Sequence, residues 1–139
     1  MLVSTKGRYA LRVMLDLAQQ PQGAFIPLTD VAFRQGISEK YLESIVSFLS
    51  KNKLVDSVRG KGGGYRLNRK ADEYTVAEIL NTAEGSVRPV SCLVNGKESC
   101  PRAESCPTYK MWADLDSKLQ KYFGSITLAD LAAGKFGEF

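Results

Sequence analysis

The sequence of 139 residues contains no histidine. Histidine is the side chain that most often serves as a general base or activates a cysteine or serine nucleophile. No pair of carboxylates stands in a recognisable hydrolytic motif either. We therefore expect that the protein is not an enzyme.

Long apolar runs are also missing, and cysteine is scarce. A membrane-crossing helix needs about 20 consecutive apolar residues, and neither such a run nor the pattern of a signal peptide is present. The cysteines are Cys92, Cys100 and Cys106, an odd number that does not make a disulfide framework. We expect a cytoplasmic protein with no membrane partner, whose cysteines are metal ligands or redox thiols.

The charge is divided unevenly along the chain. Residues 1–70 contain 12 Lys/Arg against 5 Asp/Glu, and residues 71–139 contain 7 against 10. The first part therefore carries a net charge of +7 and the second −3. Clustered Lys and Arg favour a polyanion partner because they release counterions from phosphates. The alternative is a solvated basic face.

Apolar periodicity and turn residues predict a mainly helical fold with one β-hairpin. Ala10, Met14 and Leu17 form one stripe of the first helix. In chain order we expect a helix at 5–19, a short amphipathic segment at 27–36, a helix at 38–51, strands at 54–58 and 65–67, a helix at 75–84 opened by a capping box, a helix from 107 capped by Gly124, and a short turn at 127–133.

A helix-turn-helix is predicted around Gly36, because a tight turn between two helices needs a small residue and a residue that tolerates positive φ. Ala32 and Gly36 meet these needs. The second helix would then bury Leu42, Ile45 and Leu49. It would present to a major groove the polar residues Glu39, Lys40, Glu43, Ser44 and Ser47.

The glycine-rich segment RGKGGGYRL at 59–67 predicts a hairpin wing with cations at its tip. Arg59 could enter a minor groove and Lys61 could pair with a phosphate. The glycines would let the backbone come close to DNA.

Residues 85–107 show no periodicity and contain all three cysteines. In the helix that follows, apolar residues recur at coiled-coil spacing, which favours dimerisation through this helix. A helix packed on its own domain stays open as the alternative, since only about two heptads are present. The seam residues are Trp112, Leu115, Leu119, Tyr122 and Ile126.

Four segments together resemble the IscR, NsrR and CymR family of bacterial regulators: STKGRYALRVMLDLA, QGISEKYLESI, VRGKGGGYRL and the cysteine loop before an apolar helix. The GRYA run points towards the IscR branch. The resemblance covers nearly the whole chain. It implies a homodimer of winged helix-turn-helix subunits that is joined by long dimerisation helices and binds a palindromic operator in double-stranded DNA.

The resemblance also implies an iron–sulfur cluster, usually [2Fe-2S], on Cys92, Cys100 and Cys106. Soft thiolates on one loop suit such a cluster, and they suit zinc as well. The fourth ligand departs from the family, because Tyr109 stands where IscR-like proteins have histidine and Arg8 stands where NsrR-like proteins have aspartate. The open candidates are Glu98, Glu104, Tyr109, an exogenous thiol or an open iron site. The first gap between cysteines, seven residues, is also longer than usual.

We therefore predict a winged helix-turn-helix domain at 1–84, a sensor loop at 85–107, and a dimerisation helix with a tail at 108–139. The main hypothesis is a regulator that senses iron–sulfur status or redox and nitrosative signals. The alternatives are a structural zinc site, a thiol redox switch, or control by a protein or metabolite partner without a cluster. The predicted DNA contacts are Thr5, Lys6, Ser38, Glu39, Lys40, Tyr41, Glu43, Ser44, Arg59, Gly60, Lys61 and Gly62.

Overall fold

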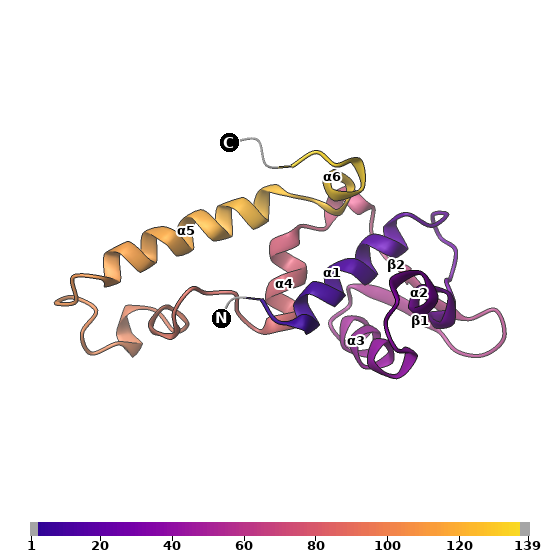
Figure 1. Ribbon diagram of the computed structural model, residues 1–139, viewed down its shortest axis with the longest axis horizontal. Helices are drawn as coiled ribbons and strands as arrows, with labels where there is room; N and C mark the ends of the chain where they lie inside the picture. Colours follow the sequence, from indigo (N-terminus) through magenta and orange to yellow (C-terminus); the bar gives the residue numbers. More distant parts are fainter. Residues whose placement is uncertain (1–2, 137–139) are drawn as a thin grey trace.

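The computed structural model describes residues 3–136, so the predicted domain ends at residues 1 and 139 lie outside the described residues. The fold is mainly helical with one two-stranded antiparallel hairpin, as predicted (Figure 1). The elements are α1 (Thr5–Ala18), α2 (Leu28–Gln35), α3 (Glu39–Lys51), β1 (Val55–Val58), β2 (Gly64–Leu67), η1 (Ala71–Glu73), α4 (Val76–Glu84), η2 (Ser91–Leu93), η3 (Lys97–Ser99), α5 (Tyr109–Ser125) and α6 (Leu128–Ala133).

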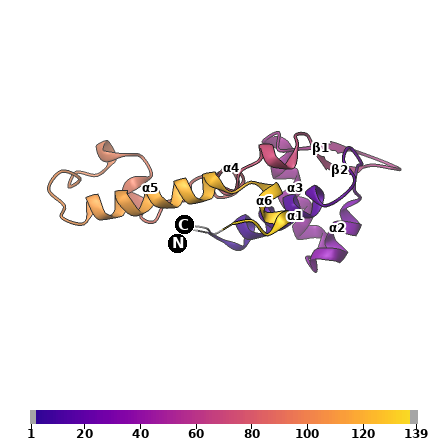
Figure 2. The same cartoon turned by 90° about the horizontal axis from the view of Figure 1, so that it is seen from above.

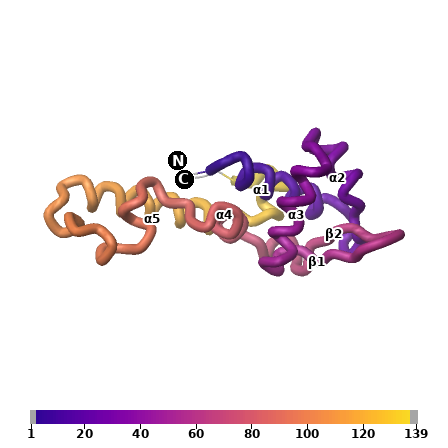
Figure 3. Tube along the Cα trace, turned by 90° about the horizontal axis from the view of Figure 1, so that it is seen from below, coloured from indigo at the N-terminus to yellow at the C-terminus, as the bar shows by residue number. Residues whose placement is uncertain are grey.

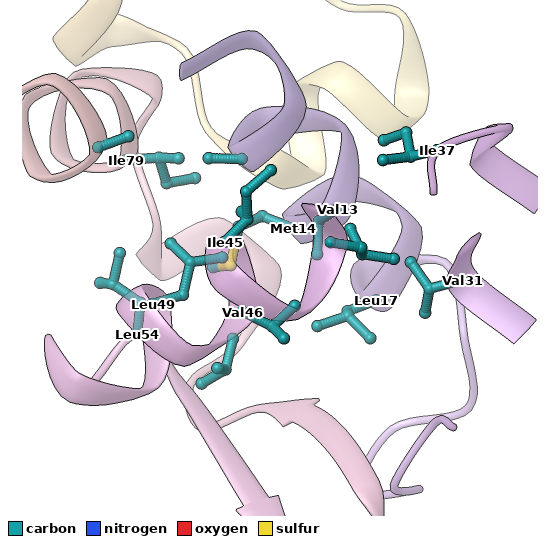
Figure 4. Close-up of a cluster of buried hydrophobic side chains, with 14 of the residues drawn as sticks. Val13, Met14, Leu17, Val31, Ile37, Ile45, Val46, Leu49, Leu54 and Ile79 are labelled. Atoms are coloured by element: carbon teal, nitrogen blue, oxygen red, sulfur yellow. The ribbon is translucent and has the colours of Figure 1, made fainter. Parts of the chain in front are cut away.

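The main core lies where α1 packs against α2, α3 and α4 (Figure 4). Met14 of α1 meets Ile45 and Leu49 of α3 in this cluster, and all three side chains are almost fully buried. The predicted core positions of α3, including Leu42, are confirmed. Burial of each large aliphatic side chain contributes roughly 1.5–3 kcal/mol, so this cluster holds the helix-turn-helix together.

The turn between α2 and α3 forms as predicted. Gly36 adopts a left-handed conformation with φ 63°, and the Ile37 amide donates to the Ala32 carbonyl at 3.2 Å. Ser38 then caps α3, because its hydroxyl accepts a hydrogen bond from the Tyr41 amide at 3.3 Å. Local residues thus fix where α3 begins.

The wing is the hairpin of β1 and β2, with Val55 opposite Leu67 and Val58 opposite Gly64. Each strand begins one residue away from its predicted start. Ile26 pairs with Tyr65 through two backbone hydrogen bonds of 2.8 and 2.9 Å, and this adds a third segment to the sheet. The wing is therefore anchored to the chain just before α2.

Two predicted caps differ from the structure. Thr75 caps α4 through the Glu78 amide, but the Glu78 carboxylate pairs with Arg69 at 2.6 Å and leaves the capping box half formed.

Gly124 does not end α5, which continues to Ser125. The helix ends there because Ile126 becomes extended, and its carbonyl accepts the Val76 amide at 2.9 Å. A tertiary backbone contact thus overrides the glycine signal. The predicted final turn is α6.

The long helix α5 reaches away from the hairpin, and the loop that precedes it lies at its far end (Figures 1, 2 and 3). The C-terminal part of the predicted seam packs within the chain. Ile126 is buried with Val76 and Leu80 of α4, and Tyr122 packs beside them. Leu115 remains exposed. No helix among residues 3–136 is both long enough and apolar enough to cross a membrane.

Candidate nucleic-acid interface and cysteine loop

The outer face of α3 carries polar side chains at its N-terminal half, as predicted. Lys40 and Ser44 are exposed at the centre of this face, and Ser44 donates to the Tyr41 carbonyl at 2.8 Å. Glu39 and Glu43 are exposed along the edge nearer the wing. This face offers both donors and acceptors, which is what reading base edges in a major groove requires.

A groove of about 540 Å³ separates α3 from the wing. Glu39, Glu43 and Ser47 line one wall, and residues 57–60 line the other. Arg59 is among the wing residues in this wall. The fold therefore brings the predicted recognition helix and the predicted wing cation to one concave surface.

The wing tip is exposed from Arg59 to Gly62. Gly60 and Gly62 have φ of 90° and 78°, which side chains rarely adopt, and open space surrounds both positions. Neither Arg59 nor Lys61 has an ion-pair partner within residues 3–136. Two unpaired cations on an open hairpin suit contact with phosphates.

The start of α1 lies against the opposite edge of α3. The Lys6 ammonium sits 3.8 Å from the centre of the Phe48 ring, so this predicted DNA contact is partly covered. Thr5 is exposed at the first position of α1. The predicted residues of α1 and α3 thus share one side of the molecule.

Tyr9 and Arg12 also belong to this surface, although the sequence analysis did not predict them as DNA contacts. The Tyr9 ring packs edge-on against Tyr41 with centroids 5.7 Å apart, and the Arg12 guanidinium lies 5.1 Å from the Tyr9 ring centre. The sequence contains a signal for this face, because Thr5, Arg8, Tyr9 and Arg12 stand at positions i, i+3, i+4 and i+7 of α1, the spacing of one helix face.

A buried carboxylate fixes the helix-turn-helix to α1. Asp16 is only 3% exposed and accepts two hydrogen bonds from Arg34, at 3.0 and 2.7 Å, and one from Gln35 at 2.9 Å. The hydrogen bonds with Asp16 raise the pKa of Arg34 against the opposing effect of burial. This bidentate pair ties α2 to α1.

The three cysteines are half-buried free thiols on the loop before α5. Cys92 lies in η2 and Cys100 directly follows η3. Cys106 Sγ is 3.3 Å from the Thr108 hydroxyl, and this hydrogen bond lowers the pKa of the Cys106 thiol. Three thiolates suit a soft metal chemically. Within residues 3–136, however, no group of three or more cysteine or acidic side chains is gathered closely enough to hold one.

The candidate fourth ligands, and Arg8 at the position where NsrR-like proteins have aspartate, lie on different elements. Tyr109 is buried at the first position of α5, whereas Glu98 and Glu104 are exposed on the loop. Arg8 is exposed on α1. Gathering the thiols would therefore require the loop to rearrange, and its only regular elements between α4 and α5 are the short η2 and η3 turns.

Nearly the whole chain, including this interface and loop, matches a known family. Residues 3–134 match the Rrf2 family, which is described as iron-dependent transcriptional regulators. The chain belongs to the Rrf2 family. Its resemblance to IscR and CymR, read first from the motifs, is confirmed. Rrf2 proteins are transcription regulators, which agrees with the expectation that the chain is not an enzyme.

Two IscR proteins are similar to this chain along nearly its full length, which supports the Rrf2 assignment. The transcriptional regulator IscR of Xenorhabdus nematophila is 45% identical over 131 residues, covering 94% of this chain and 79% of the relative. The IscR of Serratia proteamaculans is 44% identical with the same coverage.

Solved structures show the same Rrf2 fold. The global cysteine regulator CymR of B. subtilis has a TM-score of 0.80 and 34% identity, covering 96% of this chain and 98% of the CymR chain. The T. potens IscR has a TM-score of 0.76 and 33% identity, covering 100% of this chain and 94% of the other. Both likenesses support a winged-helix regulator.

Proposed function

We propose that this Rrf2 regulator binds a palindromic operator in double-stranded DNA as a cytoplasmic homodimer, with α3 in the major groove and the wing at its edge. The observation that carries the proposal is the shared groove, in which Glu39 and Glu43 of α3 face Arg59 of the wing. Polar side chains on α3 would read base edges, and the cations would hold phosphates.

Further predicted contacts lie on α1 and at the start of α3, outside the lining of this groove. Tyr41 is 37% exposed at the start of α3, and Thr5 begins α1 on the same side. Tyr9 and Arg12 extend this surface. We propose that Tyr41, Thr5, Tyr9 and Arg12 contact the DNA backbone beside the operator half-site, because hydroxyl, phenol and guanidinium groups commonly donate to phosphates.

Operator binding is tested with the full chain and a random-sequence DNA library. We expect selection to enrich a palindrome, and we expect Arg59→Ala to weaken binding to it by about 1–3 kcal/mol. Lys135→Ala is the matched control, since it removes one exposed cation beyond α6. Failure to enrich any sequence above bulk DNA would refute the proposed function, and an unchanged affinity of Arg59→Ala would refute only the role of the wing.

We further propose that Cys92, Cys100 and Cys106 hold an iron–sulfur cluster of the two-iron type, which would make the loop at 85–107 the sensor. The family description as iron-dependent and the soft donor set support this. When bound, such a cluster supplies a redox-sensitive group whose gain or loss can change how the loop is ordered.

A thiol switch is the second candidate. It is favoured by the separation of the three sulfurs and by the hydrogen bond between Cys106 and Thr108, which lowers the pKa of the Cys106 thiol. Anaerobic purification with iron, sulfide and zinc assays separates the candidates. Iron and sulfide with visible absorption support the cluster, and stoichiometric zinc supports a structural metal. A colourless protein that stays free of iron after reconstitution excludes the cluster and leaves the thiol switch.

A further inference from the structure

Residues 84–88, here called the junction segment, lie where α1, α4 and α5 meet. Glu84 is the last residue of α4, and Gly85 ends that helix with φ 79°. Cys92 follows a few residues later in η2. The junction segment therefore connects the DNA-binding unit directly to the cysteine loop.

One end of the junction segment caps α1. Ser4 is the N-cap of α1 but its side chain does not cap its own helix, and the first turn has no acidic residue. Instead, Glu84 Oε1 accepts hydrogen bonds from the Ser4 amide at 2.8 Å, the Ser4 hydroxyl at 2.7 Å and the Gly7 amide at 3.0 Å. A helix start leaves its first amides unpaired and favours negative charge. The capped turn contains Thr5 and Lys6.

Glycine at position 7 is what lets this carboxylate approach. A Cβ added to Gly7 would overlap Glu84 Oε1, so Gly7→Ala would displace the carboxylate. Burial disfavours the charged form, but the hydrogen bonds from Ser4 and Gly7 outweigh it and lower the pKa of Glu84. The cap is a charged group supplied across a tertiary contact.

The other end of the junction segment is held by α4 and α5. The buried Val87 donates its amide to Asn81 Oδ1 at 3.0 Å and accepts Gln120 Nε2 at its carbonyl at 2.6 Å. Arg88 pairs with Asp116 of α5, which is only 8% exposed. The junction backbone is thus fixed to α5 within four residues of the α1 cap.

We propose that Glu84 is a positioning residue through which the state of the cysteine loop reaches the DNA-contacting end of α1. A rearranged loop pulls on Arg88, shifts the junction segment and withdraws the carboxylate from Ser4 and Gly7. The first turn of α1 then frays, because its amides lose their acceptor. The regulatory part of this proposal rests on the proposed iron response.

Operator affinity tests the regulatory part. The full chain is compared in iron-loaded and iron-free forms, as wild type, Glu84→Ala and Glu78→Ala. Glu78 is the matched control, since its carboxylate lies on the same helix but pairs with Arg69. In the wild type, we expect the operator affinities of the iron-loaded and iron-free forms to differ by roughly 5- to 150-fold, the usual range for coupled sites. In Glu84→Ala, but not in Glu78→Ala, we expect this ratio to fall to about one. A ratio that persists in Glu84→Ala overturns the proposal. Gly7→Ala, whose Cβ would displace the Glu84 carboxylate, provides a second variant if the alanine protein does not fold.

Hydrogen exchange tests the junction without iron. Arg88→Ala should accelerate amide exchange in the first turn of α1, although no hydrogen bond or ion pair within residues 3–136 joins Arg88 to that turn. Glu78→Ala should leave this exchange unchanged. Unchanged exchange in Arg88→Ala overturns the proposal. If the wild-type affinity ratio is one, the proposed iron response fails, and the exchange result alone decides whether Glu84 couples the loop to α1.

Discussion

At the scale of single residues, the wing glycines serve different purposes. Gly60 and Gly62 have positive φ but open surroundings, so they shape the tip and leave it free to approach a ligand. Gly64 has φ 150°, and a Cβ there would overlap the Ile26 carbonyl. It therefore permits the backbone pairing that anchors the wing.

Gly64→Ala should destabilise the protein more than Gly62→Ala. Both changes place a side chain at a strained φ, which costs about 1–3 kcal/mol, but only the first also displaces the backbone of Ile26. Thermal unfolding of the two variants measures the difference. Equal melting temperatures would contradict the assigned role of Gly64.

The Glu84 carboxyl gives stability a specific pH dependence. Its pKa is lower in the folded chain than its ordinary value, so the unfolded state binds the proton more tightly. Its contribution is therefore present above the ordinary glutamate pKa of about 4.3 and is lost as the pH falls through the lower folded value. Urea unfolding should show wild type more stable than Glu84→Gln at pH 6, with the gap closing at pH 3. A gap that widens on acidification would be inconsistent with this cap.

At the scale of elements, α5 has two parts with different partners. Its C-terminal part packs on α4 through Tyr122 and the residue after the helix, Ile126. Its N-terminal part exposes Met111 at 53% and Leu115 at 39%, one helical turn apart. Exposed apolar side chains on one stripe of a projecting helix favour a second copy of the chain as the partner.

Leu115→Glu should convert the proposed homodimer into a monomer, because it places a charge in the apolar seam. Ser117→Glu is the control, since it adds the same charge at an exposed position of α5 away from that stripe. Light scattering coupled to gel filtration measures the mass of each variant. A dimer that survives Leu115→Glu would remove α5 from the interface.

At the scale of the whole molecule, the basic wing and α3 lie at one end and the cysteine loop at the other (Figure 1). The net charge of +7 in residues 1–70 belongs to the DNA-binding end. Within one chain, the junction segment and α5 join the cysteine loop to the rest of the molecule, so a change at the loop can reach the groove along either of them.

Salt should weaken operator binding steeply, since phosphate contacts release counterions. Lys61→Ala should reduce affinity uniformly across DNA sequences and lower the slope of log affinity against log salt by about one. Fluorescence anisotropy between low and high salt provides the slope, with Lys135→Ala as the reference. An unaltered slope would mean that Lys61 makes no phosphate contact.

The sequence alone determined the features that depend on local chemistry. Gly36, Ser38 and the apolar spacing of Leu42, Ile45 and Leu49 placed the helix-turn-helix, because turn conformation, capping and helical periodicity are properties of neighbouring residues. The glycine run placed the wing, and the motifs identified the family.

Only the tertiary structure decided the features that join distant residues. The Ile126–Val76 backbone contact ended α5 after Gly124, the Asp16–Arg34 pair joined α2 to α1, and Glu84 capped α1 from α4. Each of these is a hydrogen bond between segments far apart in the chain, so no local pattern could reveal it. The same holds for the three cysteines, whose shared loop was evident from the sequence but whose separation in the fold was not.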